Sequence, residues 1–216
     1  MWEPEIGRST SPRSLEGHSV ARFHVGLDLG QSRDYTALCV AEKVPPEGSD
    51  DYELHVRHLE RFRDVLYPEV VERVSRLMEA LQLRGETALA VDATGVGTAV
   101  VDMLRRAGLT FDAVTITGGD TETQSGHDSY RVPKRDLVGN LQVFLQCGRL
   151  KIARSLEHAE TLKAELLNFR VKISLSTAHD SYEAWREGDH DDLVLAAALA
   201  AWSARAPAFM VLIGRA

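Results

Sequence analysis

Aspartates at three separated places carry the chemistry that this chain offers. Asp28 closes the apolar run GLDLG, Asp92 closes the run ALAVD, and Asp191 and Asp192 stand directly before an Ala-rich segment. Carboxylate oxygens are hard ligands that suit Mg²⁺ or Mn²⁺. If one fold gathers these side chains, we expect a carboxylate cluster that binds divalent metal.

Each aspartate also has a simpler structural explanation. Asp28 could form a turn and Asp92 could cap a helix. The TGVGTAV segment that follows Asp92 resembles a phosphate-binding turn but lacks the last glycine of GxGxxG. Either Asp191 or Asp192 alone could be an ordinary N-cap, whereas both together with Asp189 concentrate negative charge that a cation would relieve.

Hydrophobic periodicity predicts a mixed α/β sheet around these aspartates. Alternating runs at 21–30, 35–44 and 52–62 predict an antiparallel meander. Further strands are expected at 86–92, 111–116, 149–153 and 170–176, and helices at 68–83, 96–107, 133–147, 155–169 and 190–205. Strands that alternate with helices imply parallel pairing. Three antiparallel strands followed by parallel strands with flanking helices resemble the ribonuclease H-like order, in which the first strand is central and the fourth lies beside it.

Length and composition favour one soluble domain. The 216 residues suit a single α/β unit at 21–206, preceded by a flexible arm or linker at 1–20 and followed by a tail at 207–216. No apolar run approaches the ~20 residues of a membrane span, and the first residues lack a signal-peptide core. Cys39 and Cys147 form no disulfide framework, so we expect a cytoplasmic protein with no membrane contact.

The charge balance limits how this chain could hold nucleic acid. The formal net charge is −7, which disfavours a broad phosphate-binding face. Arg131, Lys134 and Arg135 flank a polar loop at 117–131. They are candidates for local DNA contacts, and an ordinary solvated basic surface is the alternative.

Four segments then resemble a known family over residues 22–205. GLDLGQSRDYTAL, VDATGVGTAVVDML, VPKRDLVGNLQVFLQCGRLKIA and REGDHDDLVLAAALAAW are similar to the nuclease domain of the large terminase subunit of tailed bacteriophages. The resemblance implies a ribonuclease H-like endonuclease that cleaves double-stranded viral DNA during genome packaging and uses two Mg²⁺ or Mn²⁺ ions. It also implies a packaging ATPase domain, a portal and a small terminase subunit as partners.

The resemblance also implies roles for individual residues. Asp28 matches the family's first-strand aspartate and would bridge the ions, Asp92 matches the acidic residue that ends the fourth strand, and Asp192 matches the ligand on the last helix. Asp191 is kept as a second metal ligand, and His190 as a supporting group or proton carrier.

Three alternatives to this function remain at the level of sequence. A RuvC-type junction resolvase shares the fold and the acidic residues, and a packaging-complex docking module could retain the site with little activity. GLDLG also resembles the first phosphate motif of actin-like ATPases, which need motifs that this chain lacks. The chain has no GxxxxGK[ST] segment, so a packaging ATPase would be a separate domain.

Overall fold

The computed structural model describes residues 21–30, 34–46, 51–80, 86–95, 97–168 and 191–205. Its strands are β1 (Phe23–Asp28), β2 (Thr36–Val44), β3 (Glu53–Phe62), β4 (Thr87–Asp92), β5 (Asp112–Thr117), β6 (Thr123–Gln124), β7 (Ser129–Pro133) and β8 (Leu150–Ile152). Its helices are α1 (Tyr67–Glu79), α2 (Gly97–Arg106), α3 (Lys134–Gln146), α4 (Ala159–Asn168) and α5 (Asp192–Ser203).

The described strands form one mixed sheet in the order β6-β7-β5-β4-β1-β2-β3-β8. β1, β2 and β3 pair antiparallel, whereas β4 pairs parallel with β1 and β5 pairs parallel with β4. The first strand is therefore central and the fourth lies beside it. The predicted ribonuclease H-like sheet, with three antiparallel strands followed by parallel strands, is confirmed.

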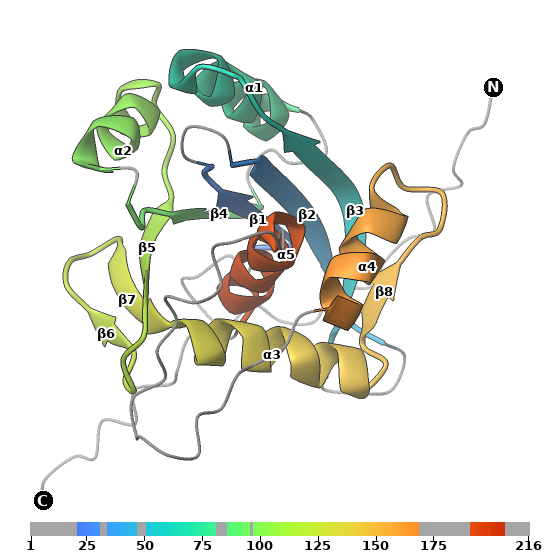
Figure 1. The fold of residues 1–216 in the computed structure, drawn as a ribbon. Coiled ribbons are helices and arrows are strands. Elements are labelled where there is room, and N and C mark those ends of the chain that lie inside the picture. Colours follow the sequence, from blue (N-terminus) through green and yellow to red (C-terminus); the bar gives the residue numbers. More distant parts are fainter. Residues whose placement is uncertain are drawn as a thin grey trace, which may run out of the picture.

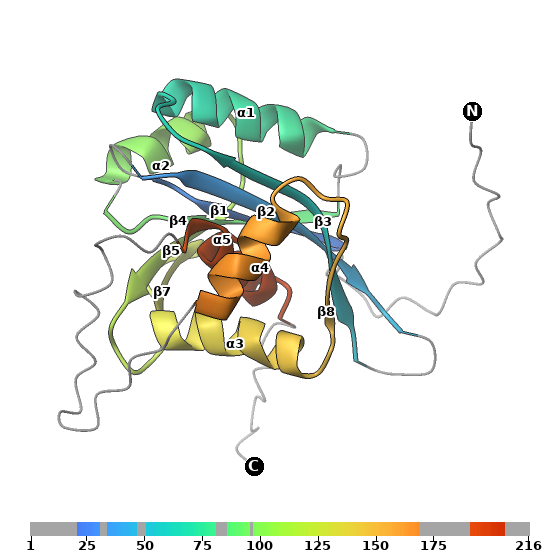
Figure 2. The ribbon, with the colours of Figure 1, turned by 45° about the vertical axis from the view of Figure 1, so that its right-hand side comes forward.

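Helices cover both faces of the sheet. α1 and α2 lie on one face, and α3, α4 and α5 lie on the other, with α5 closest to the central strands (Figures 1 and 2). Each face has its own apolar core, because alternate residues of β1, β2 and β4 point to opposite sides. α5 is almost entirely apolar and buried, as expected of a helix enclosed by the sheet and two other helices.

A glycine in β1 permits the close approach of α5. A Cβ atom built on Gly26 would lie 1.9 Å from the carbonyl oxygen of Ala196 and 2.7 Å from the amide nitrogen of Ala200. Small residues on α5 complete the contact, since Ala196 and Ala200 are both fully buried. Helix α5 thus packs with its backbone against the strand that ends in Asp28.

One region of the sheet differs from the prediction. The segment 117–131 was predicted to be a loop, but it contains β6 and most of β7, which pair antiparallel with each other. β7 also pairs parallel with β5, so backbone pairing holds a segment whose side chains are mostly polar. The predicted strand at 170–176, the arm at 1–20 and the tail at 207–216 lie outside the described residues.

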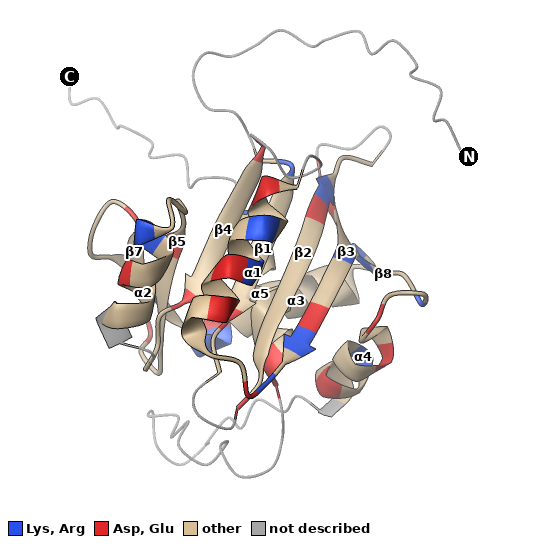
Figure 3. Ribbon diagram, turned by 90° about the horizontal axis from the view of Figure 1, so that it is seen from above, with Lys and Arg blue, Asp and Glu red and all other residues tan. Residues whose placement is uncertain are grey.

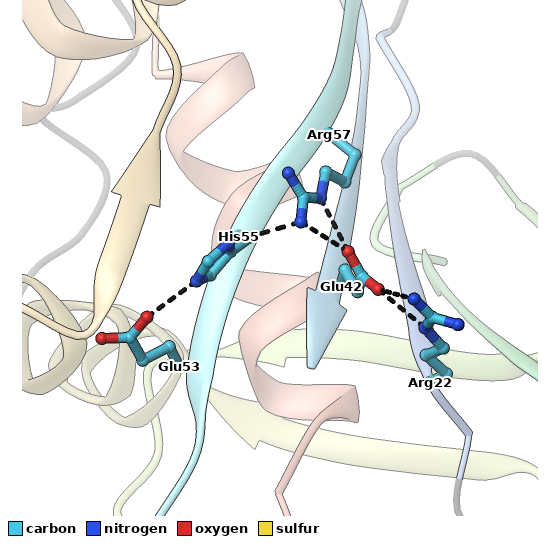
Figure 4. A network of polar contacts seen from close by, with 5 residues as sticks. All are labelled: Arg22, Glu42, Glu53, His55 and Arg57. Atoms are coloured by element: carbon cyan, nitrogen blue, oxygen red, sulfur yellow. Dashed lines mark hydrogen bonds and ion pairs between the residues drawn. The ribbon is translucent and has the colours of Figure 1, made fainter. Parts of the chain in front are cut away.

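A polar network closes the sheet at the end opposite Asp28. Glu42 near the end of β2 is 6% exposed and accepts hydrogen bonds from Arg22 Nε and Arg57 Nε, each at 2.7 Å (Figure 4). His55 lies 3.4 Å from Arg57 and 2.7 Å from Glu53, which extends the network along β3. Within the described residues, no helix is long and apolar enough to cross a membrane.

Candidate active site

The register of the two central parallel strands brings two aspartates together. Leu27 of β1 pairs with Val91 of β4, so Asp28 and Asp92 follow side by side at the carboxyl edge of the sheet. Ligands collect at this edge in parallel sheets. Both side chains lie on the face that α5 covers, and both residues are only 8% exposed.

Burial dominates the electrostatics of this pair, and Lys134 compensates it in part at Asp92. Burial raises the pKa of Asp28 well above its usual range, and the nearby carboxylates of Asp92, Asp192 and Asp191 raise it further. Burial also raises the pKa of Asp92, although hydrogen bonds from Thr94 oppose the rise; the backbone amide of Thr94 donates to Asp92 Oδ1 at 2.7 Å. The interaction between the two carboxyl groups raises the pKa of Asp28 and opposes the rise in the pKa of Asp92.

The first residues of α5 bring two more carboxylates to the same place. Asp192 is 9% exposed and accepts a hydrogen bond from an Arg61 guanidinium nitrogen at 3.0 Å. Asp191 accepts one from Lys134 Nζ at 2.8 Å. We call Asp28, Asp92, Asp191 and Asp192 the aspartate cluster.

Neither Asp191 nor Asp192 is explained as an ordinary helix cap. Asp191 occupies the N-cap position of α5, yet among the described residues its side chain makes no capping hydrogen bond. Oxygen Oε2 of Glu165, on α4, accepts the backbone amides of Leu193 at 3.0 Å and Val194 at 3.2 Å instead. A capping role therefore does not account for the two aspartates.

The carboxylates of the cluster are of the type that binds divalent ions, although among the described residues they are not arranged to surround one. Buried, mutually repelling carboxylates are the donor set that Mg²⁺ and Mn²⁺ prefer. No group of three or more acidic, His or Cys side chains within the described ranges is arranged to hold an ion. Two of the carboxylates are directed toward basic groups, Asp192 to Arg61 and Asp191 to Lys134. Burial first, and repulsion from the neighbouring carboxylates second, raise the pKa of Asp28, so a cation beside it would be stabilising.

The remaining predicted site residues lie in different surroundings. Lys134 begins α3 and contacts the cluster through Asp191. Arg135 instead pairs with Asp120, at 2.6 Å, and Arg131 lies on the exposed side of β7. His190 lies outside the described residues.

Arg61 and Glu165 were not predicted as site residues, although the register of each in the sequence is a signal for it. Arg61 follows Leu59 by two residues on the buried side of β3, so strand alternation directs a charge inward. Glu165 follows Leu162 by three residues, which places it on the apolar stripe of α4. A charged residue in a buried register usually has a partner, and here each partners the cluster or its helix.

A groove opens at the same edge of the sheet as the cluster, although none of the four aspartates lines it. It has a volume of about 620 Å³, and its walls include Gly30, Gly95, Arg63 and Tyr67. Gly30 and Gly95 follow Asp28 and Asp92 by two and three residues, so the groove adjoins the carboxyl edge of the sheet. Gly30 has no room for a side chain, because a Cβ there would lie 2.5 Å from the backbone of Asp34.

Comparisons with solved structures identify the fold. The nuclease of the large terminase from the thermophilic phage G20c is 22% identical with a TM-score of 0.56, covering 82% of this chain and 80% of that one. The human cytomegalovirus terminase nuclease domain is 14% identical with a TM-score of 0.50, covering 84% and 83%. The nuclease domain of g2p, the large terminase of bacteriophage SPP1, solved with bound Mn, is 10% identical with a TM-score of 0.48, covering 83% and 84%.

Family membership follows from the sequence itself. A comparison with curated proteins found no match. The family described as "Terminase RNaseH-like domain" matches residues 25–202, which include β1, β4 and α5 with their aspartates. The resemblance drawn from the four sequence segments is thereby confirmed, and the chain belongs to the terminase RNaseH-like domain family.

Proposed function

We propose that this chain is a divalent-metal-dependent endonuclease that cleaves double-stranded viral DNA during genome packaging. Membership of the terminase family supports a nuclease and packaging role. The observation that carries the proposal is the burial of Asp28 beside three further carboxylates at the carboxyl edge of the sheet. Carboxylates gathered at a buried place without a cation would destabilise the fold at neutral pH, and a purely structural role would not require such a cluster.

The aspartates divide the work in this proposal. Asp28 interacts electrostatically with Asp92 and with both α5 carboxylates, so it would be the ligand that the ions share. Asp92 and Asp192 would each hold one ion, and Asp191 is a second ligand on the α5 side. Two bound ions would activate a water and relieve charge on the leaving oxygen of the phosphodiester. The family resemblance also leaves His190 as a supporting group or proton carrier.

The DNA would be held by local contacts. Basic and acidic positions are interspersed along α1 and β3, and the net charge is −7, so a broad basic face is not the mode of binding (Figure 3). Of the three candidate DNA-binding residues, Lys134 would meet a phosphate near the cluster, since it contacts Asp191. Arg131 and Arg135 would contact the DNA further out. The groove beside Gly30 and Gly95 would receive the strand next to the scissile phosphate.

Partners follow from the family. A packaging ATPase domain, a portal and a small terminase subunit would present the DNA in the cytoplasm of the host cell. The cleavage site itself would need only the aspartate cluster and its ions.

The test is cleavage of supercoiled and linear duplex DNA with Mn²⁺, Mg²⁺ or chelator. We expect metal-dependent cleavage that falls at least about 100-fold in Asp28→Asn and Asp192→Asn, because each removes a charge that holds an ion. Asp102→Asn is the matched control, since Asp102 is an exposed aspartate on α2. It should cleave at the wild-type rate.

Other outcomes would separate the alternatives. Folded protein that cuts no DNA with either metal would overturn the nuclease proposal and favour a docking module. A dimer that prefers four-way junctions over linear duplex would favour a RuvC-type resolvase. Unchanged cleavage in both cluster variants would remove the aspartate cluster from the mechanism.

A further inference from the structure

The N-terminus of α5 requires a cap that its own aspartates do not supply. The first amide groups of a helix have no partner within the helix, and buried amides without partners cost about 1–3 kcal/mol each. Leu193 and Val194 are both fully buried, so water cannot easily satisfy their amides. Asp191, at the N-cap, makes no such bond within the described part of the chain.

Glu165 supplies this cap from a neighbouring helix. One of its oxygens accepts both amides, at 3.0 and 3.2 Å, and the residue is only 8% exposed. Burial raises the pKa of Glu165 to about 7, while Arg61 and the two amides favour its ionised form. Because Glu165 accepts both amides, the carboxylates of Asp191 and Asp192 are not needed to cap α5.

Arg61 links this cap to a metal-ligand candidate. Its guanidinium lies 3.0 Å from Asp192 and 3.6 Å from the second oxygen of Glu165. The guanidinium also stacks 3.9 Å from the centre of the Tyr35 ring, which limits how far it can move. Its side chain is 13% exposed, so these interactions are poorly screened by solvent.

We propose that Glu165 and Arg61 are positioning residues, with Glu165 setting the height of the first turn of α5 and Arg61 aiming the Asp192 carboxylate toward Asp28. Neither needs to touch DNA or metal for this role. The inference rests on the proposed nuclease function for its consequence, while its structural content is independent of activity. Partners that orient metal ligands typically change metal affinity by 10- to 100-fold when they are removed.

The first test measures amide hydrogen exchange in the metal-free protein. In Glu165→Ala, exchange at Leu193 and Val194 should accelerate about tenfold or more, while the amides of β4 keep their wild-type rates. Glu165→Gln keeps an oxygen that can accept both amides, so its exchange should stay close to wild type. Glu160→Ala is the matched control, because Glu160 is an exposed acid on the same helix.

The second test measures cleavage as a function of Mn²⁺ and of DNA concentration. Glu165→Ala and Arg61→Ala should raise the half-saturating Mn²⁺ concentration about tenfold or more, and leave the KM for DNA within about twofold. Glu165→Gln should restore most of the Mn²⁺ dependence, which a loss of packing alone would not explain. Arg61→Lys keeps the charge without the planar fork and should fall between wild type and Arg61→Ala.

The two proposals fail in different ways. Wild-type exchange at Leu193 and Val194 in Glu165→Ala, or an unchanged Mn²⁺ dependence in both Ala variants, would overturn the positioning role. Absence of cleavage by the wild-type protein would instead overturn the nuclease proposal. In that case the exchange measurement, and direct titration of Mn²⁺ into the wild-type and variant proteins, still decide whether Glu165 and Arg61 set α5 and Asp192.

Discussion

Substitution of Gly26 by alanine should push α5 away from β1 and, as a consequence, disable the site. The added Cβ would lie 1.9 Å from Ala196 O, whereas real Cβ contacts essentially never fall below 3.0 Å, so about 1.1 Å of displacement is required. Both contacting atoms belong to the backbone of α5, so no side-chain rotation relieves the clash. Helix α5 is packed between the sheet and α3, which resists the shift.

The expected magnitudes follow from that displacement. Overpacking of this kind costs about 1–3 kcal/mol of unfolding free energy, and we expect the upper end because backbone must move. A shift of about 1 Å at Asp192 relative to Asp28 should lower cleavage about 100-fold in the molecules that remain folded. Urea unfolding measures the first effect, and initial cleavage rates at saturating Mn²⁺ measure the second.

Gly139→Ala provides the control for this experiment. Gly139 lies inside α3, and a Cβ there meets nothing within 4 Å. Alanine should therefore stabilise that helix by about 0.5–1 kcal/mol and leave cleavage unchanged. Gly26→Ala protein with wild-type unfolding free energy and wild-type cleavage would refute the close-packing argument.

Three further substitutions test the charges of the fold. Asp28→Asn should raise the unfolding free energy of the metal-free protein at pH 7, because the raised pKa of Asp28 makes its ionised form unfavourable in the folded state. Mn²⁺ should raise the Tm of the wild type more than the Tm of this variant. Burial lowers the pKa of His24 from 6.5 to about 4, so between these pH values the unfolded chain binds a proton that the folded chain does not. The free energy of unfolding should therefore fall by at most about 3 kcal/mol as pH drops from 7 to 4. His24→Gln should lack that part of the fall in urea titrations. Burial opposes ionisation of Glu42, but Arg22 and Arg57 outweigh this effect and hold its pKa below the usual range. Glu42→Gln should therefore lower the unfolding free energy by about 1–2 kcal/mol at pH 7. This difference from wild type should shrink as pH falls below about 4.5.

The strand ends and the parallel pairing were predictable because their signals are local, whereas the central place of β1 came from the ribonuclease H-like resemblance. Alternating apolar runs end at Asp28 and Asp92, and a helix lies between β4 and β5, so both the strand ends and the parallel pairing follow from periodicity. The pairing of β7 was not predictable in this way. Its partner β5 is held through backbone groups, while its own side chains show little apolar alternation.

The aspartates of the candidate site could be predicted from the sequence, whereas the roles of Arg61 and Glu165 could not. Asp28, Asp92 and Asp192 stand at element ends, where sequence alone suggests a shared edge. Arg61 and Glu165 lie within elements, and their role depends on which residues face each other across the fold. No local pattern gives the distance of 3.0 Å between Arg61 and Asp192 or the bond from the α5 amides to α4.

Charge balance at the cluster argues for divalent rather than monovalent ions. Its four aspartates and Glu165 face two basic side chains within the described residues, Arg61 and Lys134, so ionisation of all these acids would leave an excess of negative charge at a buried place. Burial and the neighbouring carboxylates raise the pKa of Asp28, which favours its protonated form in the metal-free protein. A divalent ion held by Asp28 and Asp92, as proposed, would supply positive charge there and favour the ionised form of Asp28. Ion binding should therefore release protons, and a site whose acids served only to cap α5 would release none.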